Sequence, residues 1–396
     1  MKILFLTPQL PFPAVSGGLI KTLRMIEFLS QFHQLDVGFF LKDESAFTLA
    51  HLKTFKQNLG SVHVFHEKLN IGRSPMAFAH SLMLAMPMSV YRNRSETFKQ
   101  ICLEKARECD VIFIDHFLMF QYVPDEFQKK IILHEHNAEF LMWERFAETK
   151  ENFVLNRLIK FEASRIKKYE KLILERATAV LAAPNDIAIL KGIVTRSVRF
   201  EETYHLGEDH LLKEPEKHFQ DSDFSLLYIG TLSWEANREG LFWFLSHVWP
   251  LVKEEEPSVK FTIIGKDSNP ELFQPWKKDH NIDWLGFVED LVPYYEKARV
   301  FVSPLNFGSG IKVKVVNALY RGIPCVTTPV GVEGLDLENG EDIMVSESPA
   351  EQSAQIVHLL KNESLWTKIS RQSRRKANQV YSWDQVLNTI KRVVEQ

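Results

Sequence analysis

The chain has 396 residues, of which 45% are hydrophobic and 25% are charged, and its formal net charge at pH 7 is −3. This length predicts at least two domains, and the composition is typical of a globular protein that folds in water. The small negative charge gives no electrostatic basis for binding nucleic acid, so we expect no nucleic-acid partner.

The cysteines and the apolar segments predict the cellular compartment of the protein. Cys102, Cys109 and Cys325 are odd in number and lack the spacing of a metal site, which predicts reduced thiols in a reducing compartment. The N-terminal apolar run is about five residues long and prolines follow it, unlike a signal peptide. No apolar run approaches the roughly 20 residues that cross a bilayer. We therefore expect a cytoplasmic protein.

The first half alternates short apolar strands with amphipathic helices. A Pro- and Gly-rich loop at 8–18 follows the first strand. Continuous apolar strands separated by helices predict a parallel, doubly wound sheet. We predict strands at 3–7, 35–40, 62–65, 111–115, 130–134 and 179–182, and helices at 19–32 and 140–176.

The pattern restarts after a polar segment at 207–223, which we interpret as a linker. Strands are predicted at 226–229, 261–264, 284–286, 300–304 and 325–328, with a helix at 241–253. The expected fold class is therefore α/β, with two tandem Rossmann-like domains at 1–206 and 224–380. Such sheets bind ligands at the carboxyl ends of their strands, here in an interdomain cleft. The segment 381–396 predicts an amphipathic C-terminal helix with Trp383, Val386, Ile390 and Val393 on one side.

The segment 301–335 carries the clearest chemical signal. It predicts a strand, a loop with Gly308, Ser309 and Gly310, a helix at 311–321, and another strand. Backbone N–H groups of a glycine loop at a helix N-terminus bind phosphate. Lys312 and Lys314 fall in the first helical turn, where the helix dipole disfavours cations unless an anion shares the site. The alternative is an ordinary β–α turn with solvated lysines.

Several segments together resemble the GT-B glycosyltransferases of family 4, which are retaining enzymes that use nucleotide sugars. The family's order and spacing are matched by LLYIGTLSWEANREGLFWF, FTIIGK, WLGFVEDLVPYYEKARVFVSPL and GSGIKVKVVNALYRGIPCVTTPVGVEGL. The Gly17–Gly18 loop, IFIDH and LHEHNAEF fit the N-terminal half, whereas residues 42–100 carry little of the likeness. By the same likeness, the C-terminal helix would pack back on the N-terminal domain.

The resemblance implies roles for individual residues. His116 would orient the donor sugar and Lys312 would stabilise the departing diphosphate, so these two are the predicted catalytic residues. Asn137 and Glu139 are expected on the acceptor side. The remaining predicted positions surround the nucleotide sugar: Gly17, Gly18, Thr231, Arg238, Gly308, Ser309, Gly310 and Lys314 near the phosphates, Asn317 near the ribose, and Gly265, Lys266, Phe287 and Val288 near the base.

The chain departs from the family pattern at two places. The family's two glutamates, which have seven residues between them, correspond to Ser309 and Asn317. The second glutamate accepts hydrogen bonds from the ribose hydroxyls. Asn317 offers one carbonyl acceptor without the charge, a loss of about 1 kcal/mol. The usual Arg and Lys after the first strand of the second half are missing. Arg238 either supplies that charge or is a solvated helix residue.

The implied activity is transfer of a sugar from a nucleoside-diphosphate sugar to a glycan or lipid-linked acceptor, in cell-surface polysaccharide synthesis. It needs no resident cofactor and no metal ion, because donors aimed at the diphosphate stabilise the leaving group. Asp221 and Asp223 precede a strand instead of ending one. His134, Glu135 and His136 are adjacent, and neighbouring strand residues point to opposite faces. We therefore expect no metal site.

Three alternatives remain open. A non-catalytic GT-B subunit fits the departures, a sugar-nucleotide epimerase would need a carboxylate pair that we do not find, and a nicotinamide oxidoreductase would need a G-x-G-x-x-G motif that is missing. Pro75–Ser95 mixes Met, Phe and Leu with arginines and could contact the inner face of an anionic membrane. The expected alternative is a helix packed on the sheet, with methionines filling gaps.

Overall fold

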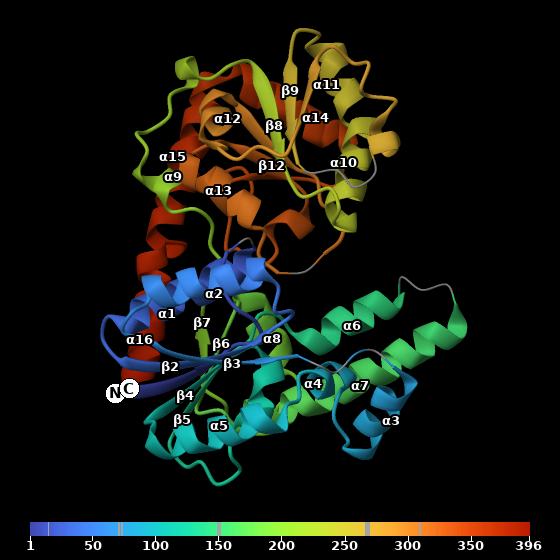
Figure 1. Cartoon of the computed structure of the whole chain (residues 1–396). Helices are drawn as coiled ribbons and strands as arrows, with labels where there is room; N and C mark the ends of the chain where they lie inside the picture. Colours follow the sequence, from blue (N-terminus) through green and yellow to red (C-terminus); the bar gives the residue numbers. More distant parts are fainter. Residues whose placement is uncertain (15, 70–71, 73, 149–151, 266–269, 309) are drawn as a thin grey trace. The chain divides into compact units, whose positions relative to one another are not determined.

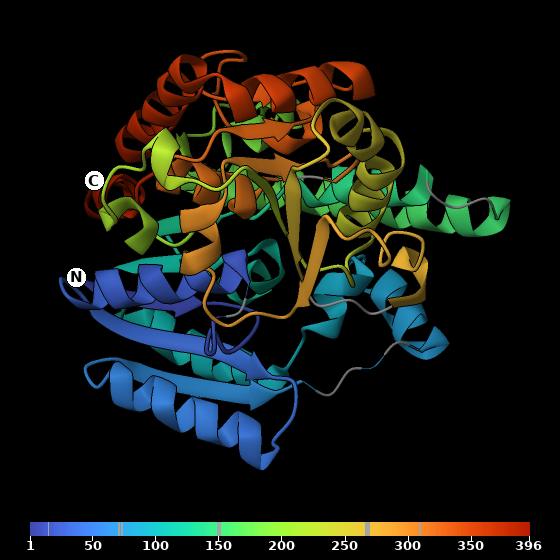
Figure 2. The ribbon, with the colours of Figure 1, turned by 90° about the horizontal axis from the view of Figure 1, so that it is seen from above.

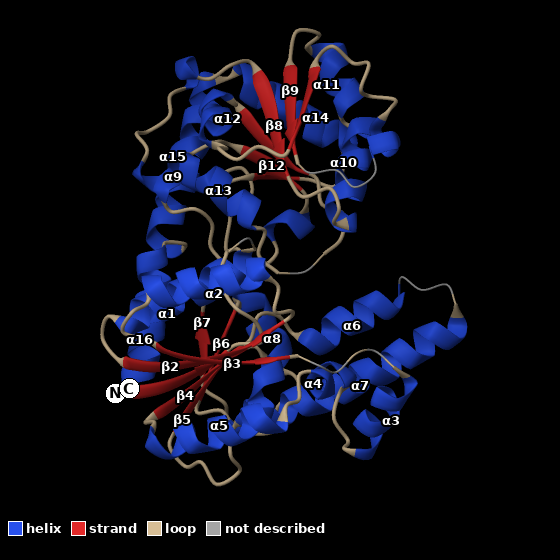
Figure 3. Cartoon of the chain, viewed as in Figure 1, coloured by secondary structure: helices blue, strands red, loops and turns tan. Residues whose placement is uncertain are grey.

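The computed structural model describes the chain except for residues 15, 70–71, 73, 149–151, 266–269 and 309. The chain divides into two compact units, Met1–Tyr204 with Val386–Gln396, and His205–Gln385. Each is an α/β unit with a parallel sheet between helices (Figure 3), so the predicted pair of Rossmann-like sheets is confirmed. Among the described residues, no helix combines the length and apolar character that a membrane crossing requires.

The first unit holds a seven-stranded sheet in the order β3-β2-β1-β4-β5-β6-β7. Its strands are β1 (Lys2–Leu6), β2 (Gln34–Leu41), β3 (His63–Lys68), β4 (Val111–Asp115), β5 (Lys130–His134), β6 (Ala179–Ala182) and β7 (Phe200–Glu202). All of its strand pairs are parallel. Residues of β4 are buried throughout because both faces of the sheet are covered by helices.

The helices of the first unit lie on both faces of its sheet. They are α1 (Gly17–Ser30), α2 (Ala46–Asn58), α3 (Pro75–Met83), α4 (Met88–Arg92), α5 (Glu96–Glu108), α6 (Glu139–Glu148), α7 (Phe153–Arg176), α8 (Pro184–Lys191) and α16 (Trp383–Glu395). In Figure 1, α1 and α2 lie on one face and α5 on the other. Seen from above, α2 runs beside the parallel pair β2 and β3 (Figure 2).

The second unit holds a six-stranded sheet in the order β10-β9-β8-β11-β12-β13. The strands are β8 (Ser225–Ile229), β9 (Lys260–Ile264), β10 (Ile282–Gly286), β11 (Val300–Ser303), β12 (Cys325–Thr327) and β13 (Met344–Val345). The helices are α9 (His210–Lys213), α10 (Glu235–His247), α11 (Trp249–Glu255), α12 (Val292–Lys297), α13 (Val313–Arg321), α14 (Pro349–Lys361) and α15 (Glu363–Val380).

Two predicted helices are divided in the structure. The expected helix at 140–176 is α6 followed by α7, and the residues between them lie partly outside the described chain. The expected helix at 241–253 is α10 followed by α11, because Pro250 lacks the N–H that a continuous helix would need and stands in the first turn of α11.

The segment 207–223 differs from a free linker, because arginines hold it against the second unit. Arg374 donates to the Leu212 carbonyl (2.7 Å), Arg321 to that of Pro215 (3.0 Å), and Arg299 to that of Ser222 (2.6 Å).

At the chain end, the apolar side of the C-terminal helix is buried, as its spacing predicts; these residues are Trp383, Val386, Ile390 and Val393. From Val386 onward the chain belongs to the first unit, where Lys130 donates to the Val394 carbonyl (2.8 Å).

Candidate active site

A pocket of about 390 Å³ opens in the first unit where β1 and β4 end. The strand order reverses between these two strands, and their connections leave in opposite directions, which opens a crevice at their carboxyl ends. The pocket is lined by Thr7 after β1, Gly18 at the start of α1, Asp115 at the end of β4, His116 after β4, and His136 after β5. The predicted residues Gly18 and His116 thus share one pocket.

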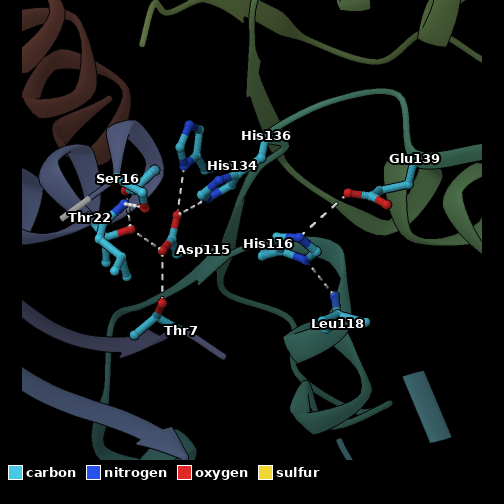
Figure 4. A network of polar contacts seen from close by, with 11 residues as sticks. Thr7, Ser16, Thr22, Asp115, His116, Leu118, His134, His136 and Glu139 are labelled. Atoms are coloured by element: carbon cyan, nitrogen blue, oxygen red, sulfur yellow. Dashed lines mark hydrogen bonds and ion pairs between the residues drawn. The ribbon is translucent and has the colours of Figure 1, made fainter. Parts of the chain in front are cut away.

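Asp115 is the centre of a buried hydrogen-bond network at this pocket (Figure 4). Its Oδ1 accepts from His134 Nδ1 (2.7 Å) and His136 Nε2 (2.8 Å), and its Oδ2 accepts from the hydroxyls of Thr7 (2.9 Å) and Thr22 (2.6 Å). Burial acts to raise the pKa of Asp115, but the two imidazoles hold it well below the usual range. The carboxylate is therefore ionised and ties together β1, α1, β4 and β5.

Asp115, His134 and His136 are also the described residues that could hold a metal ion, because their ligand atoms lie within 4.8 Å of one another. His134 and His136 share a face, since they are two residues apart. The alternation expected for three adjacent residues therefore separates only Glu135 from the possible metal ligands. The pKa of Glu135 is raised by burial and by the carboxyl of Glu170. Both histidines contact the carboxylate at hydrogen-bond distance, and the expectation of no metal ion stays a prediction.

His116 is held in an unusual backbone conformation at the pocket. Its φ is +89°, on the side of the Ramachandran plot that residues with a Cβ rarely occupy. Leu118 N donates to its Nδ1 (3.5 Å), so the ring proton sits on Nε2, which faces Glu139 Oε1 at 3.6 Å. Burial lowers the pKa of His116 to about 3, and repulsion from His136 adds to this effect. His116 is therefore a neutral imidazole that presents a hydrogen-bond donor.

Glu139 reaches His116 because other carboxylates fix the start of α6. Glu170 accepts from the amides of Glu139 (2.9 Å) and Phe140 (2.8 Å), and Asp186 accepts from that of Ala138 (3.0 Å). These bonds satisfy amides that a helix N-terminus otherwise leaves unpaired. Burial raises the pKa of Glu139 to about 7, opposed by His136 and reinforced by Asp186. The predicted acceptor residue therefore changes charge near neutral pH.

Some residues of this site were not predicted. Lys21 on α1 is fully buried, and among the described residues nothing accepts a hydrogen bond from its ammonium. Burial lowers its pKa to about 7, against the attraction of Asp115. Thr7 and Asp115 lie at the ends of adjacent strands, so knowledge of the strand order would have been enough to predict that they meet.

The remaining predicted residues of this unit lie around the same pocket or next to it in the chain. Gly17 begins α1, and a Cβ at Gly18 would lie 3.3 Å from the His136 ring. Asn137, which follows His136 in the chain, is half-buried.

The glycine loop of the second unit lies at the equivalent place, between the ends of β8 and β11, where that sheet also reverses its order. Gly308 and Gly310 have φ of +132° and +73°, which glycine adopts without strain. Lys312 is the N-cap of α13; its ammonium donates to the Gly310 carbonyl and lies 3.8 Å from Glu333 Oε2. Ser309 lies outside the described residues. A cation is thus fixed at a glycine loop and a helix N-terminus.

Lys314 is connected through Asn237, which was not predicted, to the loop that follows β8. Lys314 Nζ donates to Asn237 Oδ1 (2.7 Å), and Asn237 Nδ2 donates to the carbonyl of Thr231 (3.0 Å). Burial lowers the pKa of Lys314 to about 7, and repulsion from Lys312 adds to it. Three of the residues expected at the phosphates, Thr231, Lys312 and Lys314, are therefore joined in one neighbourhood, and Arg238 follows Asn237 on α10, half-buried.

The residues expected near the base follow the next two strands. Gly265 follows β9, and its amide donates to Gly286 at the end of β10 (2.8 Å). A Cβ at Gly265 would lie 1.9 Å from the Gly230 carbonyl, so only glycine fits there. Phe287 is exposed and Val288 is half-buried. Lys266 lies outside the described residues.

Asn317 differs from its expected surroundings. It is buried in α13, its Oδ1 accepts from the Glu208 amide (2.9 Å), and it also hydrogen-bonds Tyr295. A Cβ at Gly207 would lie 1.7 Å from the same oxygen. The carbonyl expected at the ribose thus fastens the segment 207–223 to α13. The family pattern could not reveal this, because the partner is 109 residues away.

This placement gives a prediction. Asn317→Ala should lower the stability of the second unit by about 1 kcal/mol, because the Glu208 amide loses its acceptor. That corresponds to a Tm lower by about 2–4 °C, with nucleotide affinity unchanged within about twofold. Calorimetry and thermal unfolding measure both. Gly207→Ala, which crowds the same oxygen, should also lower Tm. Weaker nucleotide binding at unchanged Tm would instead place Asn317 at the ribose.

Comparison with known proteins finds a family match within the second unit. Residues 223–362 match the family described as "Glycosyl transferases group 1". Over 379 residues the chain is 25% identical to an uncharacterized 44.6 kDa protein in the cps region of Klebsiella pneumoniae, covering 92% of each chain.

Solved glycosyltransferase structures share the fold of the whole chain. Sucrose-phosphate synthase from Thermosynechococcus elongatus superposes with a TM-score of 0.69 at 15% identity, covering 100% of this chain and 98% of that one. HepE of Anabaena, in complex with UDP and glucose, has a TM-score of 0.65 at 15% identity, covering 100% and 99%. S. aureus TarM in a complex that contains UDP has a TM-score of 0.66 at 11% identity, covering 100% of both chains. Residues 223–362 therefore match the group 1 glycosyl transferases, in a chain with the fold of the GT-B glycosyltransferases.

Proposed function

We propose that the protein is a retaining, metal-independent glycosyltransferase that moves a sugar from a UDP-sugar to a glycan or lipid-linked acceptor. The observation that carries the proposal is the glycine loop at the N-terminus of α13, with Lys312 fixed at its N-cap, inside the matched domain. UDP is the proposed nucleotide because HepE and TarM are both solved with UDP. Retention follows from the resemblance to family 4.

The setting is proposed from the relative and from the cysteines. The Klebsiella protein is encoded in a cps region, which supports a role in cell-surface polysaccharide synthesis. Cys102, Cys109 and Cys325 are buried free thiols, which supports a reducing, cytoplasmic location.

In the proposed reaction, the bond between the anomeric carbon and the diphosphate breaks while negative charge develops on the leaving phosphate. Lys312 and the loop amides stabilise that charge without a metal ion, because they are already oriented before the bond breaks. The acceptor oxygen bonds to the anomeric carbon on the face that the diphosphate leaves, and the departing phosphate oxygen takes the proton of the acceptor hydroxyl. Neither a protein nucleophile nor a protein base is then needed. His116, neutral with its proton on Nε2, donates a hydrogen bond to the donor sugar.

Titration calorimetry with UDP, GDP, ADP, CMP, dTDP and NAD, each with and without EDTA, tests the proposal. We expect heat from UDP alone, unchanged by EDTA, because the proposed phosphate site consists of lysines and amides. Slow hydrolysis of a UDP-sugar that the protein binds should occur without an acceptor. Lys312→Ala, which removes the proposed phosphate-binding cation, is the control variant for this site. Binding that EDTA abolishes would contradict the metal-independent site, and NAD binding would contradict the transferase.

A non-catalytic subunit is the second candidate, and a specific observation favours it. Asn317 replaces the glutamate that the family places at the ribose, and its carbonyl is engaged with Glu208. Such a subunit would bind a partner enzyme and would not hydrolyse the donor. Silence across the whole nucleotide panel, with an unfolding transition that shows an intact protein, would favour it over the transferase.

A further inference from the structure

The outward face of α7 is unusually apolar for a surface helix. Phe153 is 68% exposed, Val154 66%, Leu158 53% and Phe161 48%. The helix buries the opposite face, with Ile159, Ala163, Ile166, Ile173 and Leu174 in the core. Its exposed apolar residues therefore exceed what packing within the first unit requires, and contiguous patches of this kind mark interaction surfaces.

The same helix is strongly basic on its accessible side. It carries seven basic residues and three acidic ones. Glu162 is buried with its ion-pair partner Arg165 and Glu170 is also buried, which leaves six other basic residues and Glu175 as its accessible acid. The exposed cations stand among the apolar side chains; Arg157 lies over the Phe153 ring at 4.8 Å, and Lys160 and Lys168 are exposed. Because the whole chain has a net charge of −3, this positive face is a local feature.

Helix α3 extends the apolar face. Arg165 of α7 donates to the Ser81 carbonyl (2.9 Å), and its guanidinium lies 5.9 Å from the Phe78 ring, so the two helices lie side by side. Met76 and Met83 of α3 are largely exposed. The expectation that methionines of this segment fill gaps against the sheet is therefore wrong for these two, because the buried residues of α3 are Ala77 and Ser81 instead.

We propose that the exposed face of α7, extended by α3, docks the protein on an anionic lipid bilayer. A basic amphipathic helix with Phe, Leu and Val between lysines is typical of helices that lie in the membrane interface. Lysine stems cover apolar surface while their ammonium groups reach anionic headgroups. A protein partner is disfavoured, since the cores of protein interfaces are depleted in lysine.

The docked surface lies close to the pocket of the first unit. Helix α6 begins at Glu139, beside His116, and packs along α7 (Figure 1). The Asn156 side chain of α7 donates to the Ala147 carbonyl near the end of α6 (2.6 Å). Ten residues of helix span about 15 Å, so a bilayer on α7 would lie about one short helix from the pocket. This consequence rests on the proposed function and suits a lipid-linked acceptor.

Co-sedimentation of the full chain with vesicles tests the surface. We expect binding to vesicles of phosphatidylglycerol and phosphatidylethanolamine, weakened by salt, and little binding to pure phosphatidylcholine. Lys160→Glu with Lys168→Glu should weaken the partition coefficient by more than tenfold, since each lysine at an anionic surface contributes about fivefold. Val154→Ser, Leu158→Ser and Phe161→Ser together should weaken it similarly, and thermal unfolding checks that each variant remains folded.

A matched control comes from α2, which also exposes an aromatic ring and lysines. Phe47→Ser with Lys53→Glu and Lys56→Glu changes the same chemistry on another helix and should leave vesicle binding within about twofold. Equal loss in this control, equal binding to phosphatidylcholine, or no binding to anionic vesicles would overturn the proposal. So would a concentration-dependent dimer in size-exclusion chromatography that the α7 variants abolish. Nucleotide binding is measured separately, so either proposal can fail alone.

Discussion

Replacing Lys312 with alanine is expected to lower kcat for sugar transfer by about a hundredfold or more, which is typical of removing one preorganised donor from a developing anion. Its ammonium is fixed at the glycine loop by the Gly310 carbonyl and by Glu333, where the leaving diphosphate is proposed to bind. Tm should change little. The ion pair with Glu333 is long, at 3.8 Å, and a cation at a helix N-terminus is itself unfavourable.

The control for this experiment is Lys253→Ala. Lys253 is another ion-paired lysine of the second unit, 2.8 Å from Asp279, and it lies on α11 away from the glycine loop. Its removal should leave kcat unchanged while shifting Tm by a comparable amount. If Lys312→Ala retained full turnover with a UDP-sugar that the protein binds, Lys312 would have no part in catalysis.

His116→Gly is expected to lower kcat by about a hundredfold without lowering Tm appreciably. The substitution removes the Nε2–H donor from the pocket, a loss of the size seen for single transition-state donors. It also relieves the backbone, because a φ of +89° costs a residue with a Cβ about 1–3 kcal/mol. That gain offsets the lost packing of the ring on Phe117, whose centroid is 4.9 Å away.

Ala85→Gly is the matched control, since Ala85 is the other described residue with a side chain at positive φ, +52°, and it lies in the turn after α3. It should keep or raise Tm and leave kcat unchanged. Similar losses of kcat in both variants would show that backbone strain, not the imidazole, matters to turnover.

The pH profile separates His116 from Glu139. With a pKa of about 3, His116 stays neutral from pH 5 to 9, whereas Glu139, at about 7, loses its proton in this range. If the charge of Glu139 matters for turnover, the plot of kcat against pH changes slope near pH 7, and this change should vanish in Glu139→Gln.

The raised pKa of Glu139 also affects stability, because the folded state binds one more proton than the unfolded state between about pH 4.5 and 7. Wild-type stability should therefore fall relative to this variant as pH rises through that window.

Much of the fold could be read from local patterns. Buried parallel strands need apolar residues on both faces, so the runs at Val111–Asp115 and Phe261–Ile264 stand out from the helices around them. The glycine loop is equally local, because the positive φ angles at Gly308 and Gly310 and the N-terminus of α13 all lie within a few residues. These features predicted the candidate phosphate site.

Other features depended on contacts between distant residues. The network around Asp115 joins side chains from β1, α1, β4 and β5, and the order of those strands is not written in any one segment. Lys21 looks like an ordinary helix lysine until α1 packs on the sheet and buries it. Asn317 was assigned to a ligand by its position in a motif, but an amide 109 residues away takes its carbonyl.

The sequence by itself therefore determined the α/β class, the two Rossmann-like sheets and the glycine loop at which we propose that a diphosphate binds, since periodicity and glycine conformation are properties of short segments. Only the tertiary structure decided which side chains meet at the pocket, which carboxylates fix Glu139 beside His116, and which face of α7 remains exposed. Those outcomes depend on burial and on non-local hydrogen bonds, which exist only once the chain has folded.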